Sequence, residues 1–303
     1  MRVPALAAIV AALCAIPQAQ TFRSTVAGVR VDVLVLEGDK PVTGLSAGDF
    51  ELLDDGVPQR IQAVQVEQVP LSMMLALDVS QSVAGHALAD LKQAARAAVA
   101  ALRASDRAAV LTFSERISLA ADWTGDRQLL NDAVDRAAAG GSTSLNDVAY
   151  AALTLRDAEP RRALALIFTD GVDTTSWLPP SAVFEAARRT DVVVYGIGLR
   201  KIAKPISPVN HNAAAALDLG LERESTNEPL LQRLAGITGG RMLYADQSRG
   251  NLEAAFVQAV NEFQRRYVLL YSPSGVPATG WHTLAVRLPG RQVTVKAREG
   301  YWR

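Results

Sequence analysis

The chain has 303 residues, of which 49% are hydrophobic and 20% charged, a composition typical of a globular protein with one large or two modest domains. Its 31 basic residues equal its 31 acidic ones, so no excess of one charge exists to attract nucleic acid or an anionic membrane. We therefore exclude both partners. The only cysteine is Cys14, which excludes a disulfide framework and thiol catalysis.

Residues 1–20 indicate a signal peptide for export. Arg2 supplies a positive start, Ala5–Ile16 is a compact apolar stretch, and Pro17-Gln18-Ala19 resembles a cleavage region. The apolar stretch is shorter than the ~20 residues that span a bilayer. We expect a periplasmic or secreted protein, and an uncleaved N-terminal anchor is the alternative.

Residues 21–69 predict a small β module. Val29–Val35 alternates between apolar and polar side chains, as a half-buried strand does. Phe50–Leu53 is a second strand candidate and leads into the turn Asp54-Asp55-Gly56, after which an extended run begins at Ile61.

Residues 70–264 predict strands alternating with helices. The predicted strands are Leu71–Leu77, Ala108–Phe113, Ala163–Phe168, Val192–Gly198 and Arg241–Tyr244. The predicted helices are His86–Leu102, Leu129–Ala138, Leu145–Leu155, Ser181–Arg189, Leu230–Gly236 and Leu252–Arg266. This order indicates the α/β class, with a doubly wound, mostly parallel sheet covered by helices on both faces.

Two further regions complete the chain. The stretch 201–227 contains a candidate helix at Ala213–Leu221, and its role stays open. Residues 265–303 return to strand patterns at Tyr267–Tyr271, His282–Leu288 and Gln292–Ala297. Because the two β-rich ends flank the α/β region, we expect the C-terminal strands to pack with the N-terminal module.

Polar residues follow two of the predicted strands. Asp78-Val79-Ser80-Gln81-Ser82 comes directly after one of them, and Asp170 closely follows another. The carboxyl ends of parallel strands meet at one edge of a sheet, so we expect both carboxylates there. Thr143 follows the pair Gly140-Gly141, which permits close backbone approach. Oxygen ligands of this kind suit a hard divalent cation such as Mg²⁺.

Each of these fragments alone has a simpler interpretation. Serine, threonine and aspartate often cap helices, and Asp170-Gly171 alone is typical of a turn. Their joint occurrence, in order and each before a helix, favours the metal site.

Together the fragments resemble the metal-ion-dependent adhesion site of von Willebrand factor A domains, whose pattern is Asp-x-Ser-x-Ser, Thr, Asp. The matching stretches are Leu77–Ser82, Gly141–Asp147 and Phe168–Asp173, within residues 70–264. The flanks Gly44–Phe50 and Arg298–Tyr301 resemble an exported bacterial subgroup of these proteins.

The resemblance implies a Rossmann-like fold and a set of metal ligands. Ser80, Ser82 and Thr143 correspond to direct ligands of Mg²⁺, or of Mn²⁺ or Ca²⁺, and Asp78 and Asp170 to carboxylates that hold bound waters. A register shifted by one residue would put Ser142 in the threonine position.

The implied function is protein binding, in which the cation accepts a carboxylate from a partner protein. Asp173, Trp123 and Trp177 are candidates for the partner-binding rim. No catalytic residue is expected.

Two alternatives are a structural envelope scaffold whose ion only stabilises loops, and a metal-dependent hydrolase. A serine triad is disfavoured because the three histidines, His86, His211 and His282, adjoin no nucleophile motif.

Overall fold

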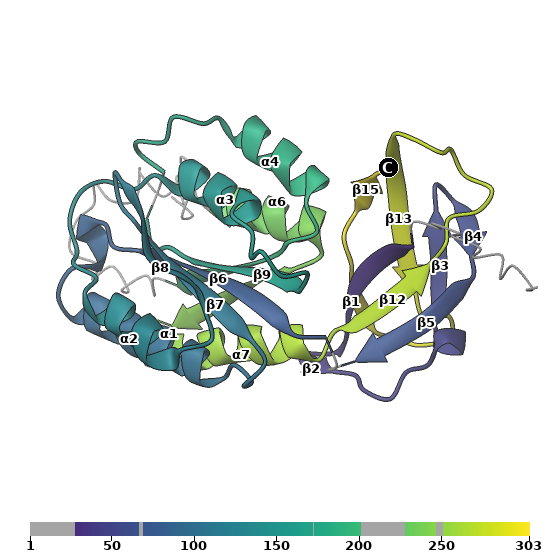
Figure 1. The fold of residues 1–303 in the computed structure, drawn as a ribbon, viewed down its shortest axis with the longest axis horizontal. Helices are drawn as coiled ribbons and strands as arrows, with labels where there is room; N and C mark the ends of the chain where they lie inside the picture. Colours follow the sequence, from purple (N-terminus) through teal and green to yellow (C-terminus); the bar gives the residue numbers. More distant parts are fainter. Residues whose placement is uncertain (1–27, 67–68, 172, 201–227, 247–250) are drawn as a thin grey trace, which may run out of the picture.

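The computed structural model describes residues 28–66, 69–171, 173–200, 228–246 and 251–303. They form two parts, an α/β part around a six-stranded sheet and a β part that combines strands from both ends of the described chain (Figure 1). The predicted export signal and the candidate helix Ala213–Leu221 lie outside the described residues.

The central sheet has the strand order β11-β10-β9-β6-β7-β8. Its strands are β6 (Leu71–Asp78), β7 (Arg107–Phe113), β8 (Ile117–Thr124), β9 (Arg162–Phe168), β10 (Val193–Arg200) and β11 (Arg241–Asp246). β6 runs parallel to both neighbours, and Leu77 lies opposite Thr112 on one side and Phe168 on the other. Every residue of β6 is buried, which explains its nearly continuous apolar sequence.

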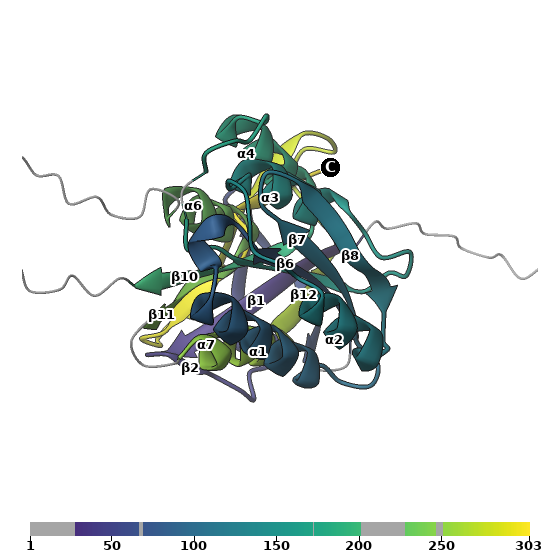
Figure 2. The ribbon, with the colours of Figure 1, turned by 90° about the vertical axis from the view of Figure 1, so that its left-hand side faces the viewer.

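Helices cover both faces of this sheet (Figure 2). One face carries α1 (His86–Ala100), α2 (Arg127–Asp135) and α7 (Leu252–Gln264), and the other carries α3 (Leu145–Thr154), α4 (Pro180–Arg189) and α6 (Glu228–Thr238). Successive side chains of β6 point to opposite faces of the sheet, so this strand contributes to a hydrophobic core on each face. Met73 and Leu75 pack with the first set of helices, whereas Met74 and Ala76 pack with the second.

The β part contains two antiparallel sheets around a core of its own. One sheet consists of β1 (Val29–Glu37), β2 (Lys40–Pro41), β5 (Ile61–Val66), β12 (Tyr267–Tyr271) and β14 (Thr294–Lys296), and the other of β3 (Glu51–Asp54), β4 (Val57–Gln59), β13 (Trp281–Arg287) and β15 (Gly300–Trp302). β1 pairs with β12 and β14, and β3 pairs with β13, so strands from the two ends of the chain lie side by side.

The structure corrects the sequence interpretation at β8, to which no strand was assigned. β8 pairs antiparallel with β7, so the central sheet is mixed. The signal was weak because Ile117, Ser118 and Leu119 are all exposed, and the register with β7 shifts near Val110. An edge strand of this kind lacks the buried alternation that identifies a strand in a sequence.

A buried arginine joins the two parts. Arg162, the first residue of β9, is 1% exposed, and its Nε donates a hydrogen bond to Oδ1 of Asp32 in β1 at 2.7 Å. Its guanidinium also lies 4.5 Å from the ring centre of Phe263 at the end of α7. This contact therefore fixes one β strand against the end of the central sheet.

We predict that Arg162→Ala lowers the free energy of unfolding by about 3–5 kcal/mol, because it removes the closest cation from the nearly dry Asp32 carboxylate and leaves only Arg30, whose Nε lies 4.0 Å away. Urea denaturation followed by circular dichroism measures this. Arg136→Ala, at the exposed end of α2, is the control and should change stability by less than about 0.5 kcal/mol. A loss for Arg162→Ala as small as the control's would contradict the assigned role.

Candidate metal centre

The centre begins with Asp78, the last residue of β6, which is fully buried. Its Oδ1 accepts a hydrogen bond from the backbone N–H of Ser80 at 2.9 Å, and its Oδ2 accepts one from the hydroxyl of Thr169 at 2.6 Å. Thr169 directly follows β9, the parallel neighbour of β6. The carboxylate therefore connects the two loops that leave these strand ends.

A chain of hydroxyl and carboxylate oxygens continues from this point. Ser80 Oγ lies 3.0 Å from Ser82 Oγ, and the hydroxyl of Ser82 donates to Oδ1 of Asp170 at 2.7 Å. Ser80 is buried and Ser82 is exposed, so the row of oxygens runs from the sheet edge toward solvent.

The glycine loop before α3 contributes Thr143. Gly140 N–H donates to the carbonyl of Val79 at 2.8 Å, and Gln81 N–H donates to the carbonyl of Gly141 at 3.0 Å. These bonds hold the loop alongside residues 79–81. Gly141 has a φ of +81°, a left-handed conformation that favours glycine.

Gly171 marks the point where the side chains meet. A Cβ atom at Gly171 would lie 3.3 Å from Thr143 Oγ1, 3.5 Å from Ser82 Oγ and 4.0 Å from Asp78 Oδ2. The structure thus brings together the side chains of Asp78, Ser80, Ser82, Thr143 and Asp170. Thr143 is buried toward this cluster and Ser142 is exposed, which favours Thr143 over Ser142 as the ligand.

The electrostatics of the cluster suit a cation. Burial raises the pKa of Asp78 above its usual range, and the charge of Asp170 raises it further, although hydrogen bonds from Ser80 and Thr169 act in the opposite direction. All the converging side-chain atoms are oxygens, the donor type that Mg²⁺, Mn²⁺ and Ca²⁺ prefer. The residues present therefore fit a hard divalent cation.

The three rim candidates lie in different places. Trp177 is 94% exposed, and its loop is held to the start of α3, where Asp147 accepts hydrogen bonds from the backbone N–H groups of Trp177 at 3.0 Å and Leu178 at 2.9 Å. The carboxylate of Asp173 faces α3, accepting from Leu145 N–H at 2.8 Å and from Asn146 Nδ2 at 3.1 Å. Asp173 therefore holds its own loop against the start of α3 through hydrogen bonds.

The rim assignment of Trp123 was wrong. Thr124, its neighbour in β8, pairs with Ala108 at the start of β7, whereas Asp78 pairs with Phe113 at the end of β7. Trp123 therefore lies near the start of β7, whereas the cluster lies near its end. The error arose because the antiparallel direction of β8 was not recognised.

A second group of potential ligands lies in the β part, where Asp54, Asp55 and His282 place ligand atoms within 4.8 Å of one another. Both carboxylate oxygens of Asp54 already have hydrogen-bond partners. Its Oδ1 lies 2.9 Å from His282 Nδ1, and its Oδ2 accepts hydrogen bonds at 2.8 Å from the hydroxyls of Tyr271 and Tyr301. Burial raises the pKa of Tyr301 to about 12, so this phenol remains a donor. We interpret the group as a buried network that ties β3, β12, β13 and β15 together.

The family model of the von Willebrand factor type A domain matches residues 72–259. The chain belongs to this family. Membership confirms the resemblance seen in the sequence and indicates a protein-interaction module of a family whose members often bind a divalent metal. A search of curated proteins found no match.

A search of solved structures found several chains that match this one. A von Willebrand factor type A protein from Catenulispora acidiphila is 13% identical, covers 86% of this chain and 74% of its own, and gives a TM-score of 0.52. An aerotolerance-related membrane protein from Bacteroides fragilis is 17% identical over 63% of this chain and 99% of its own, with a TM-score of 0.47. The vWF domain of the type V pili tip protein Mfa5 from Porphyromonas gingivalis is 12% identical over 64% and 95%, with a TM-score of 0.46. Within the described residues, no helix is long and apolar enough to cross a membrane.

We predict that Asp173→Ala destabilises the chain by about 1–3 kcal/mol, since it leaves the buried N–H of Leu145 without an acceptor. Asp173→Asn keeps one side-chain oxygen and should lose less. Urea denaturation of both variants tests this, and equal stability of the alanine variant and the unmodified chain would contradict it.

Proposed function

We propose that this chain is an exported, metal-ion-dependent protein-binding module. The observation that supports the proposal is the convergence of five oxygen-bearing side chains, from three separate loops, beside Gly171. Ser80, Ser82 and Thr143 would hold a Mg²⁺ ion directly, with Asp78 and Asp170 around it. The bound cation supplies a positive position that accepts a carboxylate oxygen from an acidic residue of a partner protein. Mn²⁺ and Ca²⁺ take the same kind of ligand.

The chain's own residues prepare this position. Asp78 fixes the backbone of Ser80, and the glycine loop is bonded to residues 79–81, so two of the three hydroxyl ligands start from ordered backbone. Because the three direct ligands are neutral, the charge of the ion is only partly offset, which favours an additional anionic ligand from outside.

We propose binding in preference to catalysis or to a purely structural role. Catalysis would require a general base beside the cluster. Asp170 already accepts a hydrogen bond from the hydroxyl of Ser82 and would also be needed near the ion. His86 lies exposed on the following helix, α1. The exposed indole of Trp177 on an anchored loop favours a partner surface, because tryptophan is a frequent anchor of protein interfaces.

We predict that the chain binds Mg²⁺ and that Asp78→Ala abolishes this binding. Gly171→Ala should weaken it at least tenfold, because the new methyl group would stand 3.3 Å from Thr143 Oγ1. Isothermal titration calorimetry of the metal-free chain measures both, and Asp90→Ala, on the exposed side of α1, is the matched control. Unchanged Mg²⁺ affinity in Asp78→Ala would remove the basis of the proposed site.

We also predict that Trp177→Ala lowers partner capture about tenfold or more without changing Mg²⁺ affinity, as truncation of an interface anchor costs about 2 kcal/mol. The measurement is the protein retained from an envelope extract of the source cell by the immobilised chain in Mg²⁺ and released by EDTA. Trp302→Ala, at a partly exposed tryptophan of the β part, is the control. Capture that persists in EDTA would falsify the metal-dependent mechanism.

A further inference from the structure

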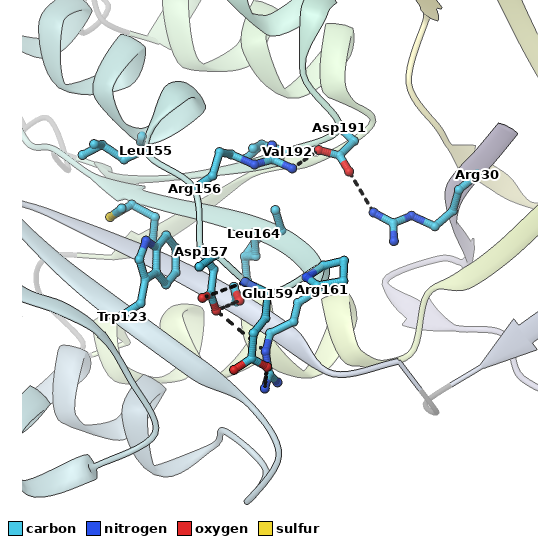
Figure 3. Close-up of a pocket in the computed structure, with 16 residues that line it drawn as sticks. Arg30, Trp123, Leu155, Arg156, Asp157, Glu159, Arg161, Leu164, Asp191 and Val192 are labelled. Carbon is cyan, nitrogen blue, oxygen red and sulfur yellow. Dashed lines mark hydrogen bonds and ion pairs between the residues drawn. The ribbon is translucent and has the colours of Figure 1, made fainter. Parts of the chain in front are cut away.

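A cavity of about 490 Å³ lies where β6 and β9 begin, at the end of these strands opposite the metal centre. Figure 3 shows the residues that line it. Met74 of β6 and Leu164 of β9 form part of its apolar lining, and the half-buried Trp123 of β8 forms one side. Arg30 reaches the cavity from β1, so both parts of the chain contribute to it. Its lining therefore combines an aromatic surface with charged groups.

The lining of this cavity holds three arginines and three carboxylates, and further arginines lie near it. Arg30, Arg156 and Arg161 line it, whereas Arg162 and Arg266, which are buried, and Arg298, which is half-buried, lie outside the lining. The carboxylates that pair with these six are Asp32, Asp157, Glu159 and Asp191. Arg107 shares Asp157 and Glu159, which adds a further positive charge.

Two of these arginines, Arg266 and Arg298, form hydrogen bonds mainly with backbone oxygens. Arg266 donates from one terminal nitrogen to the carbonyls of Asp32, Gly239 and Lys296, and its buried Nε has no hydrogen-bond partner among the described residues. Arg298 donates to the carbonyl of Gly300 at 2.5 Å. Carbonyl oxygens solvate a guanidinium but do not cancel its charge.

Two of these arginines have lowered pKa values, mainly because they are removed from water. Burial lowers the pKa of Arg162, Asp32 opposes this, and the nearby charges of Arg266 and Arg30 lower it further. Burial likewise lowers the pKa of Arg298, Asp191 and Asp32 oppose this shift, and Arg30 adds to it. An anion placed here would relieve this repulsion.

The accessible donors are those of Arg30 and Arg156. Both pair with Asp191, Arg30 at 2.8 Å from Oδ2 and Arg156 at Oδ1 (Figure 3). Their side chains are 29% and 41% exposed, and each guanidinium carries five N–H donors, more than these contacts use. Arginine pairs well with carboxylates because its donors match their geometry.

We propose that this cavity binds an apolar group that carries one carboxylate, either the C-terminal residue of a peptide or a fatty acid. The carboxylate pairs with Arg30 and Arg156, and the apolar portion packs against Trp123 and Met74. Because the two arginines belong to different parts of the chain, the ligand bridges the α/β part and the β part. The site is separate from the metal centre and does not depend on it.

Three probes test the inference: N-acetylphenylalanine, its uncharged amide and octanoate. Isothermal titration calorimetry, with tryptophan fluorescence as a second signal, should show at least one of the two carboxylates binding tenfold or more tightly than the amide. Arg156→Gln should remove that preference, Arg30→Gln should weaken it, and Arg136→Gln, on the exposed end of α2, should leave it unchanged. Thermal melts establish that each variant is folded.

The outcomes distinguish a peptide C-terminus from a fatty acid, and distinguish both from failure of the inference. Binding of N-acetylphenylalanine alone assigns a peptide terminus, binding of octanoate alone assigns a fatty acid, and binding of both assigns their shared chemistry. The inference would be overturned if neither acid bound more tightly than about 1 mM, if N-acetylphenylalanine bound but no more tightly than its amide, or if folded Arg156→Gln bound fully. The probes should bind equally well in Mg²⁺ and in EDTA, so this result is independent of the metal centre.

Discussion

The buried carboxylate of Asp78 is the constraint on which the candidate metal centre depends. A charge without exposure to water requires hydrogen bonds, and Asp78 obtains them from Ser80 N–H and from the hydroxyl of Thr169. One partner lies on its own loop and the other follows the neighbouring parallel strand. The need to satisfy one buried group therefore fixes the distance between two loops, and the hydroxyls of Ser80 and Ser82 are placed as a consequence.

Part of this arrangement could be predicted from the sequence. Strand patterns end at Asp78 and just before Asp170, and parallel strands present their carboxyl ends at one edge, so the approach of these two loops follows from topology. Thr169 was not singled out, because a threonine at the end of a strand gives no signal of its hydrogen-bond partner. Trp123 was misplaced because β8 is exposed and turns back along β7, and an edge strand with exposed apolar residues has no clear periodicity.

The distribution of charge could not be predicted either. The chain as a whole is neutral, yet arginines gather where the β part meets the α/β part. Composition records only totals, whereas this accumulation depends on which strands pair. β1 brings Arg30 and Asp32 to the place where the two parts meet, and β9 begins there with Arg162.

The metal centre and the arginine-lined cavity lie at opposite ends of the same elements. α3 begins beside Thr143 and the cavity includes Ala152, near its end, while β6 runs from the cavity at Ser72 to the metal centre at Asp78. The α/β part thus carries two separated candidate sites at opposite ends of one sheet, and the cavity is also lined by Arg30 of the β part.

Crystals soaked in Mn²⁺ provide the most direct test of the central claim. An anomalous difference map should show one peak among the hydroxyl oxygens of Ser80, Ser82 and Thr143, with the carboxylates of Asp78 and Asp170 nearby. A peak only elsewhere, or an ion in this space held by none of the three hydroxyls, would contradict the account.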